Sequence, residues 1–325
     1  MVAPKNEAQG KIRELEIDFA NDLQEGMKRV LKVGEAESDK VLVAKYNGKI
    51  YAVGNFCSHF GVPLEYGEMF DDKLLCPAHG AAFSVVSGEP ESAPALDGIP
   101  TFPVVERDGK AFVQIPEEGL PRTTTQVLTP RDPDNKTHYV IIGGGAAGLN
   151  CAETLRQSGF SGQITMLTKE AIVPYDRTLL SKALPGLETG KAPSLRPVPF
   201  LEQASIDVRT DSSVSKVDGA RKTVTLESGE TVHFDKLCIA TGGKAIVPEV
   251  DGVGLKGVFT LRTKKDQEAI RDLAQSAKSV TVIGGSWIAT EVAAALIGKY
   301  KDQLKVNLVC SASVPFEGTL GKEVG

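Results

Sequence analysis

Two short segments of this 325-residue chain each place a cysteine close to a histidine. Cys57 and His59 form the first pair, Cys76 and His79 form the second, and 16 residues separate the pairs. Thiolate sulfur and imidazole nitrogen are both good ligands for transition metals. The chain has only four His and five Cys, and half of its imidazoles fall into this one pattern, so the spacing predicts a metal centre.

This ligand set matches a [2Fe-2S] cluster in which two cysteines hold one iron and two histidines hold the other. We therefore predict Cys57 and Cys76 as ligands of the first iron, and His59 and His79 as ligands of the second. The alternative is a Cys2His2 zinc site, whose usual spacing is a cysteine pair followed by a histidine pair. Here each segment mixes one Cys with one His, which favours the cluster.

The residues after the second pair, Gly80, Phe83 and Gly88, resemble those of Rieske-type ferredoxins, and the resemblance covers about residues 30–115. Respiratory-chain Rieske proteins place Ser and Tyr hydroxyls near the cluster, whereas the matching positions here are Ala81 and Phe83. Hydrogen bonds to cluster sulfur stabilise the reduced form. The resemblance therefore implies a ferredoxin-like potential, toward the bottom of the roughly −150 to +300 mV Rieske range.

The composition is that of an ordinary globular chain, with 41% hydrophobic residues, 24% charged residues and a formal net charge of −5. This charge provides no basic surface for nucleic acid. No run of about 18 apolar residues occurs, so no membrane span is expected. Residues 1–7 lack the features of a signal or transit peptide. We expect a cytoplasmic location, and the sequence leaves a mitochondrial association open.

The length predicts two domains or slightly more, at about 150 residues each. Early in the chain, short β-rich runs flank an Asn47-Gly48 turn, which is a strong hairpin signal. Later, longer apolar runs alternate with helical stretches, which indicates parallel βαβ units. The fold class is a small all-β Rieske domain followed by α/β Rossmann-like FAD- and NAD(P)-binding domains. The predicted limits are 20–116 for the Rieske domain, 117–136 for a linker, 137–250 for the first FAD-binding segment and 251–325 for the start of the NAD(P)-binding domain.

A Gly-rich turn follows the apolar run at residues 139–142 and precedes a helical stretch, which is the context of a dinucleotide-binding motif. In this motif Gly143 permits a tight turn, Gly145 lets the backbone approach a pyrophosphate, and Gly148 lets the helix pack on the strand. The helix begins at Ala146, and its free N-H groups favour the negative charge of the pyrophosphate.

An acid after the second strand of such a unit binds the ribose, and Glu170 is the best candidate. A second, weaker motif consists of Gly284, Ser286 and Ala289. Ser286 replaces the Gly at which a phosphate must approach, and Cys310 replaces the second acid. The choice between NAD and NADP therefore stays open.

From about residue 137 to residue 325 the chain resembles the flavoprotein pyridine nucleotide oxidoreductases of the ferredoxin-reductase and apoptosis-inducing-factor type. A Rieske module ahead of such a flavoprotein resembles the apoptosis-inducing factor 3-like subfamily. The residues that carry the first resemblance are Gly143 to Gly148, Pro174-Tyr175-Asp176-Arg177, Leu180-Ser181-Lys182, Ala240-Thr241-Gly242-Gly243 and Ile283-Gly284-Gly285.

The resemblance implies that Arg177 and Lys182 contact FAD, with Lys182 near the flavin N5 and paired with Glu291 beside the nicotinamide. It also implies the reaction: hydride from NAD(P)H to FAD, then single electrons to the cluster and on to an unknown acceptor such as a redox protein. No Cys-X-X-Cys pair is present to take the electrons instead. Two alternatives are a redox-sensing or apoptosis-signalling protein, and the reductase partner of an oxygenase or nitrite-reducing system.

The resembling family continues well past the position that matches Gly325. We therefore expect a fragment whose second nucleotide-binding fold is incomplete at its C-terminus. Such a fragment exposes a sheet edge and apolar surface.

Overall fold

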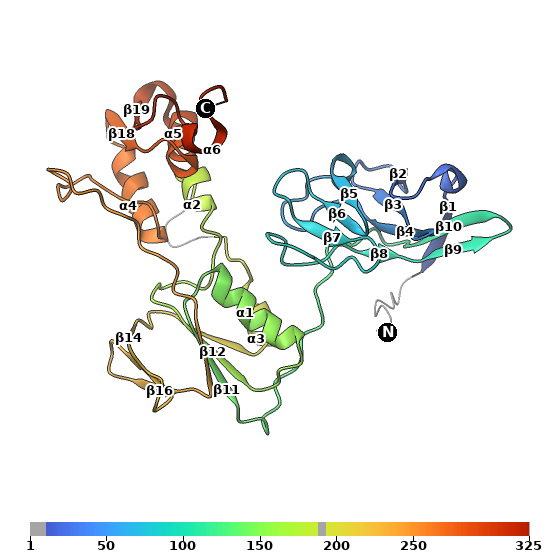
Figure 1. The fold of residues 1–325 in the computed structure, drawn as a ribbon, viewed down its shortest axis with the longest axis horizontal. Helices are drawn as coiled ribbons and strands as arrows, with labels where there is room; N and C mark the ends of the chain where they lie inside the picture. The colour runs from blue at the N-terminus through green and yellow to red at the C-terminus, as the bar shows by residue number, and fades with distance from the viewer. Residues whose placement is uncertain (1–10, 188–192, 325) are drawn as a thin grey trace. The chain divides into compact units, whose positions relative to one another are not determined.

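The computed structural model describes residues 11–187 and 193–324, and the chain divides into two compact units, residues 1–127 and 128–325 (Figure 1). The first unit is built of strands. Its three sheets have the orders β1-β10-β9, β2-β3-β4-β8 and β5-β6-β7. The strands are β1 (Ile12–Glu16), β2 (Lys28–Lys32), β3 (Lys40–Tyr46), β4 (Lys49–Gly54), β5 (Glu68–Phe70), β6 (Lys73–Leu75), β7 (Ala82–Ser84), β8 (Thr101–Phe102), β9 (Val104–Arg107) and β10 (Lys110–Pro116), with 3-10 turns η1 (Ala20–Asp22) and η2 (Leu64–Tyr66).

Two tight turns set the strand pairing of this unit. Asn47 and Gly48 join β3 to β4 with φ angles of 49° and 70°, and Asp108 and Gly109 join β9 to β10 with 52° and 73°. Positive φ at both central residues is the type I′ geometry that suits the twist of a hairpin. The predicted Asn47-Gly48 hairpin is confirmed. Strands β8 and β9 are separate because Pro103, which lies between them, has no N-H for the sheet.

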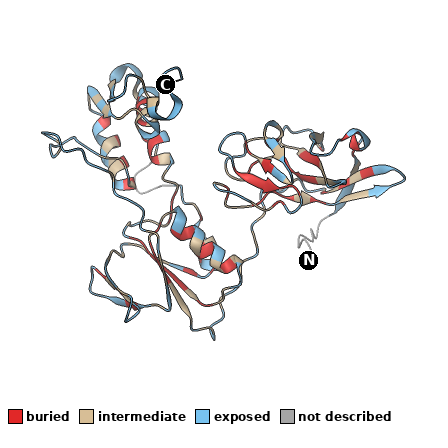
Figure 2. Ribbon diagram, in the orientation of Figure 1, coloured by how far each residue is buried: buried red, intermediate tan, exposed pale blue. Residues whose placement is uncertain are grey.

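Strand β3 is buried on both faces and separates two hydrophobic clusters (Figure 2). Because successive side chains of a strand point to opposite faces, Val41 and Val43 enter one cluster while Leu42 and Ala44 enter the other. The second cluster supports the predicted metal ligands. It contains Leu42, Ala44, Val53, Cys57, Leu64, Leu74, Cys76, Ala81, Phe83, Val85, Ala95 and Ile99.

Segments outside the predicted domain limits also pack on the two units. Strand β1, which lies before residue 20, pairs along its whole length with β10. Thr124 lies in the predicted linker, residues 117–136. It exchanges two backbone hydrogen bonds of 2.8 and 3.1 Å with Gly98 of the first unit. Further along, the N-H of Thr129 donates to the carbonyl of Arg156 at 2.9 Å, within the second unit. Backbone hydrogen bonds therefore hold the predicted linker to the first unit at Thr124 and to the second unit at Thr129.

The second unit begins with a parallel sheet of order β13-β12-β11-β17, with a three-stranded antiparallel sheet, β14-β15-β16, and a separate parallel pair, β18-β19. The strands are β11 (His138–Ile142), β12 (Gln163–Leu167), β13 (Ile206–Arg209), β14 (Val214–Asp218), β15 (Thr223–Leu226), β16 (Thr231–His233), β17 (Lys236–Ile239), β18 (Ser279–Ile283) and β19 (Lys305–Val309). The helices are α1 (Ala146–Gln157), α2 (Leu179–Lys182), α3 (Val198–Gln203), α4 (Lys264–Ala274), α5 (Trp287–Tyr300), α6 (Glu317–Leu320) and the 3-10 turn η3 (Lys301–Gln303).

A buried arginine holds the end of α1 against the sheet. Arg156 is fully buried, and its guanidinium donates to the carbonyls of Phe160, Gly162, Ala204 and Ser205 at 2.7 to 2.9 Å. The charge is thus surrounded by oriented carbonyl dipoles, as a buried cation requires. These bonds fix the direction of the helix that begins at the Gly-rich turn.

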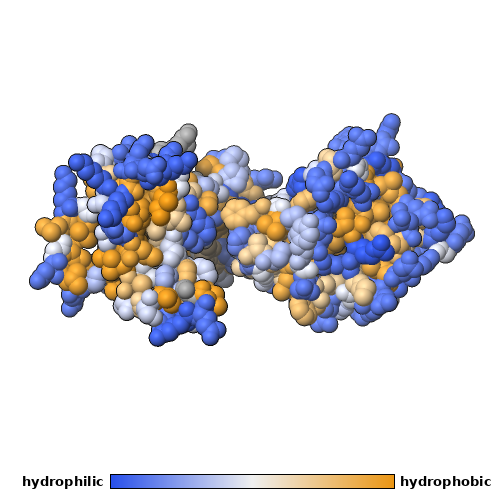
Figure 3. Space-filling view, turned by 90° about the horizontal axis from the view of Figure 1, so that it is seen from above, coloured by the Kyte–Doolittle hydropathy of each residue, from blue (hydrophilic) through white to orange (hydrophobic). Residues whose placement is uncertain are grey.

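The β18-β19 pair leaves large apolar side chains in solvent. Ile283 is 75% exposed and Val309 is 51% exposed. Apolar side chains are visible at the surface of the chain between hydrophilic ones (Figure 3). Within the part of the chain that the structure describes, no helix is both long and apolar enough to cross a bilayer.

His138, the first residue of β11, makes the stability of the fold depend on pH. Its Nε2 lies 2.9 Å from Thr165 Oγ1. Burial lowers the pKa of His138, and the positive charge of the nearby Arg209 lowers it further. Protonation is therefore harder in the folded chain than in the unfolded chain. The stabilisation is complete above the ordinary pKa of about 6.5 and is lost progressively as the pH falls below it.

His138→Gln keeps a hydrogen-bonding side chain but removes the titration. We expect the variant to lose less free energy of unfolding than the wild type between pH 7 and pH 5. Urea unfolding followed by far-UV circular dichroism measures this. The control is His233→Gln, at an exposed histidine in β16. Parallel losses in the wild type and His138→Gln would contradict the assignment.

Candidate functional site

The four predicted cluster ligands lie in two loops of the first unit that share one backbone pattern. In each loop the cysteine N-H donates to the carbonyl five residues later, and the cysteine carbonyl accepts from the glycine N-H four residues later, at 2.7 to 3.0 Å. In the first loop the N-H of Cys57 donates to Val62 and the N-H of Gly61 donates to Cys57. In the second loop the N-H of Cys76 donates to Ala81 and the N-H of Gly80 donates to Cys76. Both glycines have left-handed φ angles, 68° at Gly61 and 72° at Gly80, which let the loops turn this tightly.

The loops place sulfur inside the unit and nitrogen at its surface. Cys57 and Cys76 are 2% and 3% exposed, and their thiols interact. The imidazoles of His59 and His79 lie 5.0 Å apart between ring centroids and nearly perpendicular, with His79 exposed and His59 half-buried. Burial, followed by the neighbouring Cys76, raises the pKa of Cys57. Metal binding at this pair therefore has to displace protons.

This arrangement fits a two-iron cluster. Within the described residues, no group of three or more His, Cys, Asp or Glu side chains converges on the position of one metal ion. A Rieske cluster needs only two protein ligands on each iron. The chain supplies these as one thiol pair and one imidazole pair, whereas a zinc site gathers four ligands around one ion. Ala81 and Phe83, beside the second loop, are fully buried.

In the second unit, the glycines of the Gly-rich turn after β11 differ in their surroundings. A Cβ atom on Gly143 would lie 2.2 Å from the carbonyl oxygen of Ala240, and one on Gly148 would lie 2.1 Å from that of Gly143. These two glycines allow close packing inside the protein. A Cβ on Gly145 would meet no described heavy atom within 4 Å. The space beside Gly145, at the N-terminus of α1, is therefore open, as the predicted pyrophosphate site requires, and its role toward FAD stays a prediction.

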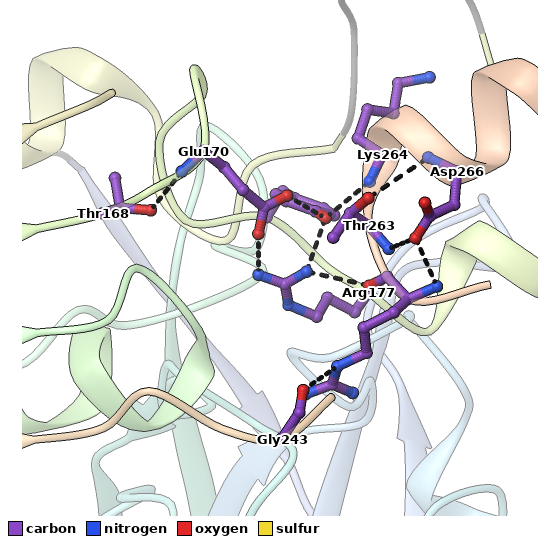
Figure 4. A network of polar contacts seen from close by, with 9 residues as sticks. Thr168, Glu170, Arg177, Gly243, Thr263, Lys264 and Asp266 are labelled. Atoms are coloured by element: carbon purple, nitrogen blue, oxygen red, sulfur yellow. Dashed lines mark hydrogen bonds and ion pairs between the residues drawn. The ribbon is translucent and has the colours of Figure 1, made fainter. Parts of the chain in front are cut away.

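The candidate ribose ligand Glu170 belongs to a polar network (Figure 4). Its backbone N-H donates to Thr168 Oγ1 at 3.3 Å, just beyond the end of β12. One carboxylate oxygen is bound by the guanidinium of Arg177, and the other accepts from the Tyr175 hydroxyl at 2.8 Å. Arg177, which the sequence predicted as an FAD contact, thus lies beside the predicted ribose ligand. Their roles toward FAD stay predictions.

Lys182 and Glu291 come together although they are far apart in the sequence. Lys182 ends α2 and Glu291 lies in α5, and Nζ and Oε1 are 3.2 Å apart. Ser181 also donates to Glu291 Oε2, at 2.5 Å. The Lys182 side chain is 47% exposed, so the ion pair itself adds little stability. The catalytic role of the pair stays a prediction.

The second Gly-rich turn, after β18, departs from the motif at Ser286. Gly284 has a φ angle of 135°, and a Cβ there would lie 3.2 Å from that of Ala289. Ser286 is the exposed N-cap residue of α5. A Cβ on Gly285 would lie 2.7 Å from that of Cys310, which occupies the position of the expected acid. The assignment of Gly284, Ser286 and Ala289 to NAD(P) stays a prediction.

Two residues, Ser181 and Tyr175, are parts of the motifs quoted above, but the sequence predicted no role for either side chain in these sites. Ser181 binds Glu291, and Tyr175 binds Glu170. Tyr175 was part of a recognised motif, and burial of a tyrosine is itself a sign that its hydroxyl has partners. Nothing local in the sequence identified those partners.

Comparisons with known proteins give matches for both units. Residues 137–325 match the pyridine nucleotide-disulphide oxidoreductase family, and residues 14–103 match the Rieske [2Fe-2S] domain. Apoptosis-inducing factor 3 of Homo sapiens is 35% identical over 318 residues, which cover 96% of this chain and 51% of that protein. The chain thus spans about half the length of this relative.

Two further matches each cover about half of the chain. The ferredoxin-NAD(+) reductase subunit of the benzene 1,2-dioxygenase system of Pseudomonas putida is 37% identical over 156 residues, covering 48% of this chain and 38% of that protein. The crystal structure of a ferredoxin reductase for the CYP199A2 system from Rhodopseudomonas palustris matches with a TM-score of 0.53 and 29% identity, covering 58% of this chain and 46% of that chain.

His79→Cys tests the mixed ligand set. We expect the wild type to contain about two irons and two labile sulfides per chain, with the EPR signature of a mixed-ligand cluster. The variant should lose that signature, because a third sulfur ligand replaces a nitrogen, while bound flavin absorbance stays unchanged. His233→Cys makes the same substitution outside the ligand loops. Zinc in place of iron in anaerobically prepared protein would refute the assignment.

Gly145→Ala and Gly148→Ala form a matched pair that tests the pyrophosphate site. Gly145→Ala should leave the unfolding midpoint close to wild type, because its methyl group enters open space, and should weaken FAD binding. Gly148→Ala should lower the unfolding midpoint, because the new Cβ collides with the Gly143 carbonyl. Thermal unfolding and FAD titration measure the two effects. Unchanged FAD affinity in Gly145→Ala would place the pyrophosphate elsewhere.

Proposed function

Because the chain belongs to the pyridine nucleotide-disulphide oxidoreductase family and carries a Rieske [2Fe-2S] domain, we propose that it transfers electrons from NAD(P)H through FAD to the cluster. The family implies FAD and NAD(P)H, and the Rieske domain implies the [2Fe-2S] cluster. The observation that carries the proposal is that one chain contains both a thiol-imidazole ligand set and a Gly-rich pyrophosphate turn.

When bound, FAD accepts the hydride of NAD(P)H and passes electrons on singly, and the cluster carries one electron at a time. The chain binds and orients these groups. Gly145 and the N-terminus of α1 receive the pyrophosphate, and Glu170 accepts from ribose hydroxyls. Glu291 holds the Lys182 ammonium at 3.2 Å. This positive charge would act on the flavin when FAD is bound.

The exposure of the cluster ligands indicates where an electron acceptor can approach. The cysteine side of the cluster site is buried, and the histidine side reaches the surface at His79. An outside acceptor can therefore approach the nitrogen-bound iron. The chain has no Cys-X-X-Cys pair, so we assign to the cluster the role that a dithiol has in related reductases.

The acceptor we propose is another redox protein. The relatives named as reductase components of dioxygenase systems support this choice and favour one second candidate, the reductase partner of an oxygenase. A redox-sensing role of the apoptosis-inducing-factor type is the other alternative, since a relative of that name matches almost the whole chain. The cytoplasmic location stays a prediction.

Steady-state reduction of ferricyanide by NADH and by NADPH tests the proposal in protein that contains both FAD and the cluster. We expect turnover that depends on FAD. Lys182→Met should slow flavin reduction roughly ten- to a hundredfold, from the loss of one charge-assisted hydrogen bond of about 1.5–3 kcal/mol. Lys301→Met, in the turn η3 after α5, is the control.

Two outcomes separate the alternatives. Protein that holds both cofactors but shows no turnover would contradict the enzyme and favour a redox sensor. Turnover with ferricyanide that is accelerated by a purified oxygenase ferredoxin would favour the reductase partner of an oxygenase.

A further inference from the structure

The buried phenol of Tyr175 connects Glu170 with Lys264, which is far from it in the sequence; both partners are labelled in Figure 4. Tyr175 is 3% exposed. Its hydroxyl donates to Glu170 Oε2 at 2.8 Å and accepts from Arg177 Nη1 at 2.8 Å and from the backbone N-H of Lys264 at 3.0 Å. A phenol has one donor and two acceptor sites. All three are used here, so the hydroxyl is held in one orientation.

The partners of Tyr175 extend the connection. Arg177 also binds the second oxygen of Glu170 and donates to the carbonyl of Arg262 at 3.1 Å. The Arg262 side chain in turn donates to the carbonyl of Gly243 at 3.2 Å. The end of β12, the segment that follows β17 and the start of α4 therefore meet at one polar cluster.

The start of α4 is well ordered by its own cap. Thr263 and Asp266 form a capping box, with bonds of 3.3 Å from the Asp266 N-H to Thr263 Oγ1 and 2.8 Å from the Thr263 N-H to Asp266 Oδ2. Lys264 is the first helical residue, and the N-H at this position has no acceptor within the helix. The Tyr175 oxygen supplies that acceptor.

We propose that Tyr175 is a positioning residue that holds the Glu170 carboxylate for the adenosine ribose of FAD and links that carboxylate to the first turn of α4. This inference rests on the proposed function, because the role of Glu170 toward FAD is part of it. Tyr175 holds one carboxylate oxygen and Arg177 the other. A carboxylate has about four acceptor sites, so sites for ribose hydroxyls remain. Holding the carboxylate before FAD arrives lowers the entropy cost of binding.

The chemistry of the phenol supports this role. Burial, and then the hydrogen bond to Glu170, raise the pKa of Tyr175 above its ordinary value. The hydroxyl therefore stays neutral at physiological pH and remains a donor to the carboxylate. Phenylalanine at this position keeps the ring and its packing but removes the donor and both acceptor sites.

A thermodynamic cycle tests the positioning role. FAD and an FAD analogue with a 2′-deoxyadenosine ribose are titrated into wild-type protein and into Tyr175→Phe. We expect the wild type to bind FAD about ten- to a hundredfold more tightly than the analogue, the range for one hydrogen bond to a charged group. In Tyr175→Phe the FAD affinity should fall, and the ratio between the ligands should shrink to about threefold or less.

The ratio distinguishes positioning from a merely structural role. A structural defect weakens both ligands equally and leaves the ratio unchanged, and that result would overturn the inference. Tyr139→Phe is the matched control. This tyrosine lies in β11, which pairs with β12, and its ring packs on Phe160 with 4.7 Å between the ring centroids. It should keep the wild-type ratio. If wild-type protein binds no FAD, the proposed function and this inference both fail.

Two further measurements complete the test. The first uses a second variant in case Tyr175→Phe does not fold, and the second examines the link between Tyr175 and α4. Glu170→Gln keeps the side-chain shape and should flatten the ligand ratio in the same way, and a wild-type ratio there would overturn the inference. Hydrogen exchange of the Lys264 amide, measured without FAD, should be faster in Tyr175→Phe than in the wild type. Equal exchange rates would remove the link to α4.

Discussion

The matching backbone turns around Cys57 and Cys76 are the constraint on which the proposed redox function depends. Each turn closes through two hydrogen bonds of 2.7 to 3.0 Å and a glycine with left-handed φ. Both cysteines belong to a hydrophobic cluster that contains Leu64, Leu74 and Phe83. The sulfur side is therefore rigid and dry, while the imidazoles reach toward solvent. An electron-transfer centre needs this asymmetry, because its potential is set inside and its exchange with partners takes place at the surface.

The second unit meets a different requirement. In the proposed function, the pyrophosphate of FAD has to approach its backbone closely. Gly143 and Gly148 have no side chain because other backbone atoms occupy that space, and Gly145 has none although the space is open. One turn thus combines two glycines that internal packing requires with one that the proposed pyrophosphate site requires. Arg156 anchors the far end of the same helix through four carbonyl groups, so the N-terminus of α1 has a fixed direction. Preorganisation of this kind lowers the cost of binding.

Polar side chains connect the two nucleotide-binding halves of this unit. The Lys182-Glu291 pair joins α2 to α5, and the Tyr175 cluster joins the end of β12 to the start of α4. The match to the two families confirms the predicted fold class, an all-β domain followed by α/β nucleotide-binding folds. The predicted domain limits and the roles of individual site residues stay predictions.

The sequence by itself predicted the cluster ligands and determined the Asn47-Gly48 hairpin and the Gly-rich turn, because turn geometry and strand alternation depend on neighbouring residues. It did not reveal β1 or β14 as parts of their sheets, or the three-residue strands β5 to β7, which are too short to show a period. Only the tertiary structure decided that the Tyr175 hydroxyl meets the Lys264 amide, 89 residues further along the chain, and that Lys182 meets Glu291. Contacts between residues so distant along the chain arise when separate segments pack together, and no local pattern encodes where a returning segment will lie.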